Sequence, residues 1–337
     1  MKKIAIEEAF ATEALVKEWR VLLEDGAPGE AGLHHNIGRI INADGGWGAM
    51  ASERLMDLGE SRIQHMNEGG VDMQLIGITA PGVQVFDADT AQALSVEAND
   101  VLADAVKAHP DRFAGLAAIA PQAPKQAAKE LERAIGLGLK GAMVNSHTKG
   151  EYLDAVQYSP ILEAAESLDV PIYIHPRHSP PAAIAPFAER HLEAAIWGFQ
   201  TETALHALRL IVTGAFDRYP NLKIVLGHLG EGLPFWLDRI DRSFSRSRRA
   251  KASYPYWRCD GLPSEYFLKN FAVCSSGHNW APAVKFVESV VGEDNLMFAI
   301  DYPYEENKQQ VDQAAEINLA APEKFYELNA RRIFKLD

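Results

Sequence analysis

The sequence has few cysteines and no long apolar run. Its 337 residues include two cysteines, Cys259 and Cys274, which are too few for a disulfide framework and lack the CxxC spacing of many zinc sites. We expect both to be free thiols, which suits a cytoplasmic protein in a reducing compartment. Because no stretch of about 18 consecutive apolar residues is present, we also expect no membrane span.

Basic residues are also scarce relative to acidic ones. The chain has 33 Lys and Arg against 46 Asp and Glu, a formal net charge of −13 at pH 7. This excess argues against nucleic acid as a partner, because proteins that bind it need positive charge to neutralise phosphates. It would also repel an anionic ligand at long range, so such a ligand would need a local positive charge, such as a metal ion or an arginine.

Apolar runs typical of strands alternate with helical patterns along the whole chain. Residues 91–110 and 125–138 have helical apolar spacing and end in breakers. About eight strand–helix repeats without a change in composition predict an α/β fold, a closed (β/α)8 TIM barrel that forms a single domain over residues 1–337. The expected strands lie near residues 3–8, 72–79, 113–120, 140–146, 171–176, 222–228, 270–276 and 295–301.

Three segments depart from this simple repeat. Residues 26–48 are rich in glycine, and residues 176–197 directly follow an expected strand, so both are expected to be long loop insertions that influence which ligand binds. Residues 242–258 are basic and aromatic. This third segment is either a solvated surface arm or a segment that packs on a neighbouring subunit.

Four of the expected strands end in residues that can bind a metal or transfer protons. They are Glu7 in KIAIEE, His175 in PIYIHP, His228 in KIVLGH and Asp301 in LMFAID. In a TIM barrel the carboxyl ends of the strands meet at one face, so these side chains could converge. Carboxylate and imidazole ligands suit Zn²⁺ or Mn²⁺. Each residue alone could be structural, and Glu8 could replace Glu7 as the inward residue, because neighbours on a strand face opposite sides.

Five motifs carry a family resemblance: IEEAF (6–10), YIHPR (173–177), GHLGEGLPFWLDRID (227–241), SSGH (275–278) and DYPYE (301–305). Together they resemble the amidohydrolase-related, metal-dependent decarboxylases. This family includes γ-resorcylate, 2,3-dihydroxybenzoate and 5-carboxyvanillate decarboxylases and is related to aminocarboxymuconate semialdehyde decarboxylase. The resemblance covers essentially the whole chain and implies a TIM barrel of the amidohydrolase type.

The resemblance implies that Glu7, His175 and Asp301 are the metal ligands. Many relatives have a histidine two residues after the first glutamate, where this chain has Ala9, as some dihydroxybenzoate and carboxyvanillate decarboxylases do. No lysine ends the fourth strand, where Asn145 lies instead. We therefore expect one divalent metal ion, Mn²⁺ or Zn²⁺.

The resemblance also assigns acid–base and substrate-binding residues. His228 matches the catalytic histidine of the family, with Glu231 as its orienting partner, and Asn145 matches a substrate contact. Arg239 matches a position that reaches the substrate of an adjacent subunit, which implies a homodimer or homotetramer. We further predict that Asp301 delivers a proton to the substrate. Aromatic residues near the site, Tyr304, Phe199 and Trp280, are candidates for walls against a substrate ring.

The expected function is non-oxidative decarboxylation of an ortho-hydroxylated aromatic carboxylate, possible in both directions. The alternative is a metal-dependent hydrolase of a lactone, amide or related acyl bond, because the same barrel and ligands could activate water. A hydratase and a non-catalytic binding barrel are further alternatives. Arg39 and Arg54 are candidates, by position alone, for binding a second carboxylate of the substrate.

Overall fold

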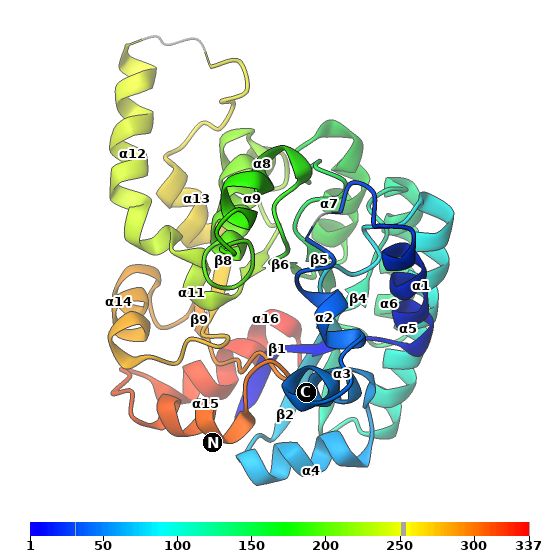
Figure 1. Cartoon of the computed structure of the whole chain (residues 1–337). Coiled ribbons are helices and arrows are strands. Elements are labelled where there is room, and N and C mark those ends of the chain that lie inside the picture. The colour runs from blue at the N-terminus through cyan, green and yellow to red at the C-terminus, as the bar shows by residue number, and fades with distance from the viewer. Residues whose placement is uncertain (31, 251–253, 337) are drawn as a thin grey trace.

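The computed structural model describes residues 1–30, 32–250 and 254–336. Its central strands lie close to the expected positions, and helices surround them (Figure 1). The strands are β1 (Ile4–Phe10), β2 (Met73–Ile78), β3 (Phe113–Gly115), β4 (Ala117–Ala118), β5 (Ala142–Asn145), β6 (Ile172–His175), β7 (Ile224–Leu226), β8 (Phe271–Cys274) and β9 (Leu296–Met297).

All pairs of neighbouring strands are parallel, in the orders β1-β2-β3 and β4-β5-β6-β7-β8-β9. The two sheets are joined by one stretch of chain, since β3 pairs with β2 and β4, after Leu116, pairs with β5. On the other side, the N–H of Asp301 donates to the carbonyl of Glu7 (3.2 Å), and the N–H of Ala9 donates to the carbonyl of Tyr302 (2.7 Å). The segment after β9 therefore meets β1, and the expected (β/α)8 barrel is confirmed.

The helices that follow the strands cover the outside of the barrel. The two helical patterns recognised in the sequence correspond to α5 and α6. The helical segments are α1 (Glu13–Glu24), α2 (Ile37–Ile41), α3 (Gly46–Met56), α4 (Glu60–Gly69), α5 (Ala88–Ala108), α6 (Pro124–Gly136), η1 (Val156–Tyr158), α7 (Ser159–Ser167), α8 (Pro181–Ala188), α9 (Gly198–Val212), α10 (Ala215–Arg218), α11 (His228–Glu231), α12 (Leu233–Arg249), α13 (Pro263–Asn270), α14 (Ala281–Val291), α15 (Asn307–Ala315), η2 (Lys324–Leu328) and α16 (Asn329–Phe334). None of these helices is both long and apolar enough to cross a membrane.

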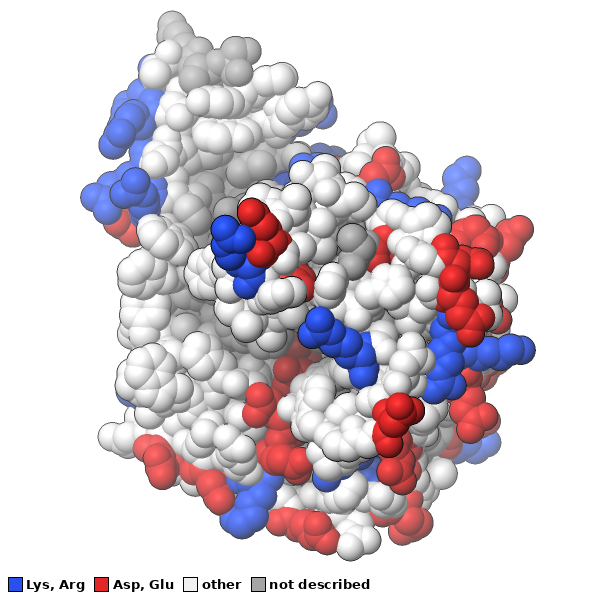
Figure 2. Space-filling model, viewed as in Figure 1, with Lys and Arg blue, Asp and Glu red and all other residues white. Residues whose placement is uncertain are grey.

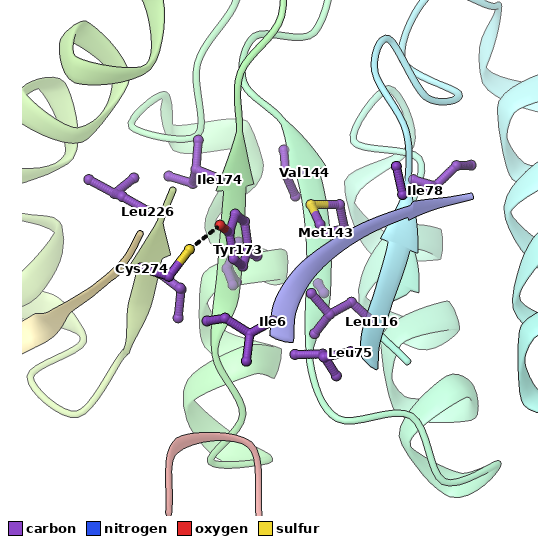
Figure 3. Packing of buried hydrophobic residues seen from close by; sticks show 14 of the residues in the cluster. Ile6, Leu75, Ile78, Leu116, Met143, Val144, Tyr173, Ile174, Leu226 and Cys274 are labelled. Carbon is purple, nitrogen blue, oxygen red and sulfur yellow. Dashed lines mark hydrogen bonds between the residues drawn. The ribbon is translucent and has the colours of Figure 1, made fainter. Parts of the chain in front are cut away.

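The strands are buried on both faces, which explains their nearly continuous apolar sequences. Figure 3 shows branched and sulfur-containing side chains of several strands packed together, among them Ile6, Leu75 and Met143. Two polar groups lie within this apolar packing: the hydroxyl of Tyr173 is 3.1 Å from the Sγ of Cys274 (Figure 3). Both side chains are fully buried; Tyr173 lies two residues before the end of β6, and Cys274 is the last residue of β8.

The three unusual segments contain more regular structure than expected. Residues 26–48 contain α2 and the start of α3, and residues 176–197 contain α8. Residue 31, within the first segment, and residues 251–253, within the basic segment, lie outside the described residues. The basic segment begins on α12, whose last turn carries three arginines, and Figure 2 shows this basic helix at the upper left. Trp257 stacks between Phe244 and Tyr254, with ring centroids 4.9 and 4.3 Å away.

Candidate metal centre and active site

Three of the predicted ligands lie together at the carboxyl end of the barrel. One ligand atom from each of Glu7, His175 and Asp301 lies within 4.8 Å of the other two. Glu7 is on β1, His175 ends β6, and Asp301 follows β9, so elements far apart in sequence bring the three together. Parallel strands bring their carboxyl ends to one face of the barrel, which accounts for this convergence.

The carboxylate of Glu7 has one oxygen held by the protein and one left free. Oε2 accepts a hydrogen bond from the Tyr173 hydroxyl and lies 3.5 Å from the Sγ of Cys274. Oε1 is buried, has no hydrogen-bond partner among the described residues, and lies 3.3 Å from Nε2 of His175. Gly227 permits this placement, because a Cβ there would lie 2.1 Å from Oε2. A buried carboxylate oxygen without a partner is costly unless a cation or donor binds it.

His175 is oriented so that one ring nitrogen faces the site. Its Nδ1 lies 2.8 Å from the carbonyl oxygen of Pro176, an acceptor, so Nδ1 carries the hydrogen and donates. Nε2 is then the nitrogen with a free lone pair, and it faces Glu7. A backbone carbonyl that fixes the tautomer in this way is typical of histidines that bind metals.

His228 lies beside the three predicted ligands, at the start of a left-handed turn after β7. Its Nε2 is 3.5 Å from Oε1 of Glu7 and 3.8 Å from Oδ2 of Asp301, and its Nδ1 is 2.8 Å from Oε1 of Glu231. The five residues 228–232 all have positive φ, between 46° and 76°. Non-glycine residues rarely adopt this conformation, which costs roughly 1–2 kcal/mol each, and strain of this kind concentrates at functional sites.

The charges of the site change the proton affinity of two of its groups. Burial raises the pKa of the Glu7 carboxyl, and electrostatic interaction with the neighbouring imidazoles, chiefly that of His228, opposes this rise. Burial alone would lower the pKa of His228, but the negative charges of Glu7 and Glu231 outweigh it and raise that pKa well above its usual value. The predicted pair of His228 and Glu231 therefore has the geometry and the charge of an acid–base unit.

The three predicted substrate-binding residues lie at different distances from the site. Asn145 pairs with His175 in the sheet register and is buried, and neither polar atom of its side-chain amide has a hydrogen-bond partner among the residues that the structure describes. The hydroxyl of Tyr304 is hydrogen-bonded to that of Thr79, which lines a small cavity at the site. Arg239 lies exposed on α12, and the described residues provide no contact between it and the other site residues.

The rings of the other two aromatic candidates pack against histidines that are not among the predicted metal ligands. The ring of Phe199 packs edge-on against His178, 5.2 Å away, and Trp280 is 63% exposed and stacks over His278. Trp47, in the 26–48 insertion, has its ring 6.4 Å from that of Tyr304. It is therefore a better candidate than Trp280 for a wall beside Tyr304.

Two residues that contact Glu7 were not among the predicted site residues. Tyr173 precedes His175 by two positions, so both side chains lie on the same face of β6. Cys274 ends β8, in the same layer. A hydroxyl and a thiol in otherwise apolar strands are signals that could have identified them from the sequence.

The donor set suits a divalent cation. Two carboxylates and one imidazole supply oxygen and nitrogen atoms, which are ligands of Mn²⁺ and Zn²⁺. The unpartnered Oε1 of Glu7 and the free Nε2 of His175 point to the same place, which a cation would fill. Ala9 lines the adjoining cavity with a small side chain and supplies no further ligand.

Comparison with known proteins shows that the chain is similar to aromatic-acid decarboxylases over nearly its full length. The chain is 36% identical over 351 residues to γ-resorcylate decarboxylase of Polaromonas sp. (strain JS666), covering 99% of both proteins. It superposes with a TM-score of 0.96, at 40% identity, on 5-carboxyvanillate decarboxylase of Novosphingobium aromaticivorans, which contains manganese and 3-methoxy-4-hydroxy-5-nitrobenzoic acid; 99% of this chain and 97% of that one are covered.

A second solved structure is a dihydroxybenzoic acid decarboxylase from Polaromonas sp. JS666, with bound manganese and the inhibitor 2-nitroresorcinol. It superposes with a TM-score of 0.85 at 34% identity and covers 99% of this chain and 97% of its own. The model of the amidohydrolase family matches residues 33–336. With its barrel, its strand-end carboxylates and histidines and these matches, the chain belongs to the amidohydrolase family.

Proposed function

We propose that the protein is a metal-dependent, non-oxidative decarboxylase of an ortho-hydroxylated aromatic carboxylic acid. One observation carries this proposal: Glu7, His175 and Asp301 converge beside the His228–Glu231 pair in a chain that matches aromatic-acid decarboxylases over nearly its full length. The substrate class is that of the dihydroxybenzoates, resorcylates and carboxyvanillates.

The cofactor in this proposal is one divalent metal ion held by Glu7, His175 and Asp301. Mn²⁺ is preferred over Zn²⁺ because two of the three ligands are carboxylates and because two related structures contain manganese. When bound, the ion supplies positive charge that fixes the carboxylate and ortho-hydroxyl of the substrate and lowers the pKa of that hydroxyl. It also provides the local positive charge that a protein with a net charge of −13 otherwise lacks.

The chemical problem is to avoid an aryl carbanion. Asp301 transfers its proton to the ring carbon that carries the carboxylate, so that carbon becomes tetrahedral. The bond to the carboxylate then breaks, its electron pair returns to the ring, CO₂ leaves, and aromaticity is restored. His228 and Glu231 hold and move the proton of the substrate hydroxyl, and the electron-rich oxygen promotes protonation of the ring. Asn145 and Tyr304 orient the ring.

The competing function is hydrolysis of a lactone, amide or related acyl bond at the same site. A panel of hydroxybenzoates and their ortho-deoxy analogues, followed by ultraviolet absorbance with Mn²⁺ or Zn²⁺ added to chelator-treated protein, separates the two. We expect loss of absorbance with ortho-hydroxylated acids only, and exchange of labelled bicarbonate into their carboxylates. Turnover of lactones or amides without loss of any hydroxybenzoate would favour the hydrolase.

Asp301→Asn tests the proton donor directly. The amide cannot deliver a carboxylic proton, so we expect turnover to fall by at least about 10³-fold while a nitro-substituted substrate analogue still binds. Asp312→Asn, a change at an exposed aspartate paired with Lys308, is the matched control and should keep full activity. Activity near that of the wild type in Asp301→Asn would contradict the proton-donor role.

We further propose that the chain is a single domain that works as a homodimer or homotetramer in the cytoplasm. Phe235 on α12, the helix that carries Arg239, contacts both Trp236 on the same helix and Phe286 on α14. The three side chains are 66%, 50% and 41% exposed, respectively. Exposed clusters of aromatic side chains are typical of protein–protein contacts. Light scattering gives the oligomeric state, and Phe235→Glu should shift it to the monomer.

A further inference from the structure

Glu8 lies next to Glu7 on β1 but has a different set of partners. Its side chain is 1% exposed. Oε1 accepts the backbone N–H of Ile300 at 3.0 Å, and Oε2 accepts the backbone N–H of Tyr302, also at 3.0 Å. One carboxylate therefore binds the two residues on either side of Asp301, a predicted metal ligand.

The backbone of Asp301 itself is in an unfavourable conformation. Its φ is 77°, in the left-handed region that residues with a Cβ rarely adopt. Its own N–H donates to the carbonyl of Glu7 at 3.2 Å. Three consecutive N–H groups, of residues 300–302, are thus bound by Glu7 and Glu8. Such an array can hold a strained residue, because release would leave buried donors without acceptors.

A second group of buried side chains supports Glu8 from the outer side of β1. Arg62, on α4, is fully buried; its Nε donates to Oε1 of Gln74 at 2.7 Å and its Nη1 to the carbonyl of Ala9 at 3.0 Å. The Nε2 of Gln74 donates to Oε2 of Glu8 at 3.5 Å. The guanidinium of Arg62 also lies over the ring of Tyr302, 4.7 Å from its centroid. Arg62 therefore supplies positive charge near Glu8 and packs against the segment that Glu8 holds.

We propose that Glu8 is a positioning residue for the metal centre: it fixes the Ile300–Tyr302 segment so that the carboxylate of Asp301 faces Glu7 and His175. This role rests on the proposed function, since it takes Asp301 as a metal ligand. Adjacent glutamates on one strand thus have separate tasks: Glu7 supplies a ligand atom, and Glu8 holds the backbone that supplies another. Groups that orient metal ligands typically change metal affinity by about 10–100-fold when they are removed.

The test is the affinity of the chelator-treated protein for Mn²⁺, measured by calorimetry and by the electron paramagnetic resonance signal of the ion. Glu8→Gln keeps the size of the side chain but turns an NH₂ group toward one of the two backbone donors. We expect an affinity about 10–100-fold lower and an altered resonance signal for the bound ion. Glu130→Gln is the matched control. Glu130 is 4% exposed and hydrogen-bonded to Asn99 and Arg133, so its change should lower stability without altering Mn²⁺ binding.

If Glu8→Gln does not fold, Glu8→Asp is measured in its place. This variant keeps a carboxyl group but withdraws it by one methylene group from the N–H groups of Ile300 and Tyr302, and the same loss of affinity is expected. A folded variant that binds Mn²⁺ within twofold of the wild type, with an unchanged signal, overturns the positioning role and leaves the proposed function intact. Conversely, if Mn²⁺ affinity depends on Glu8 as described but the wild-type protein decarboxylates no hydroxybenzoate, the proposed function alone is overturned.

Discussion

Nδ1 of His228 lies 2.8 Å from Oε1 of Glu231, three residues further along the same left-handed turn. The other oxygen of Glu231 is buried without a hydrogen-bond partner among the described residues, so the carboxylate is directed to the imidazole alone. This contact turns Nε2 of His228 toward Glu7 and Asp301. The turn thus produces an oriented imidazole from residues that are close in sequence.

Glu231→Gln should lower the pKa of His228, because it removes one of the two negative charges that raise it. The variant should also lose about 10²-fold in turnover, since the imidazole is less well oriented and less basic. A nuclear magnetic resonance titration of the metal-free protein measures the pKa, and initial rates measure the turnover. Glu316→Gln, at an exposed glutamate, is the control; an unchanged His228 titration in Glu231→Gln would contradict the prediction.

Tyr173→Phe should weaken metal binding about tenfold, because it removes the hydroxyl that donates to Oε2 of Glu7. The change keeps the ring and therefore the packing of β6. Tyr326→Phe is a matched control at another buried tyrosine, remote from the site residues in sequence. Titration of both chelator-treated variants with Mn²⁺ checks the prediction, and equal affinities for the two would refute it.

Glu30→Ala should loosen the insertion at residues 26–48. Glu30 forms an ion pair with Arg177, whose side chain is 2% exposed and lies two residues after His175. Removing one partner of a buried ion pair leaves an uncompensated charge, which costs about 3–5 kcal/mol. We expect lower stability in urea and faster proteolysis within the insertion. The double change Glu30→Ala with Arg177→Met should recover part of the loss; no recovery would mean that the pair is not the cause.

Glu202 should make the protein less stable as the pH rises from 4.5 to above 7. Burial raises the pKa of this carboxyl to about 7, while the hydroxyls of Tyr152 and Ser146 oppose the rise. Because the folded pKa exceeds the unfolded value, folding favours the neutral acid. The stabilisation that the neutral carboxyl group contributes is fully present below pH 4.5 and is lost as the pH rises through 7. The total loss of unfolding free energy is about 3 kcal/mol, at about 1.4 kcal/mol per pKa unit.

Urea unfolding of the wild type and Glu202→Gln between pH 4.5 and 8 measures this effect. The amide is neutral throughout, so the difference in unfolding free energy between the two proteins should change across this range. Parallel pH profiles would show that Glu202 does not titrate as described.

The order of strands and helices could be predicted from the sequence because parallel strands buried on both faces are apolar throughout. Each expected strand has a counterpart, although the segment at 113–120 forms two short strands, with one sheet neighbour each. The helices within the insertion at residues 26–48 could not be predicted, because α2 and α3 lie among glycines and the sequence there has only weak helical periodicity. The family resemblance drawn from the five motifs is confirmed by the comparisons.

The convergence of Glu7, His175 and Asp301 could be predicted because each follows or ends a strand of one barrel. The choice between Glu7 and Glu8 could not, since strand alternation places them on opposite faces without saying which face is inward. The structure resolves it through the partners of each carboxylate. The left-handed turn at His228 could not be predicted from the sequence either, because Leu229 and Glu231 are residue types that rarely adopt positive φ.

The barrel closes where its first and last strands meet, and the proposed metal centre lies at that seam. Glu8 and Tyr302, which are bonded across it, lie 294 residues apart in the chain. Contacts of such separation form late, because the loop entropy of nearly the entire polypeptide must be overcome first. During synthesis, a nascent chain has Glu7 from the start but cannot assemble the donor set until Asp301 has left the ribosome. Binding of the proposed metal would therefore require the chain to be almost completely synthesised and folded.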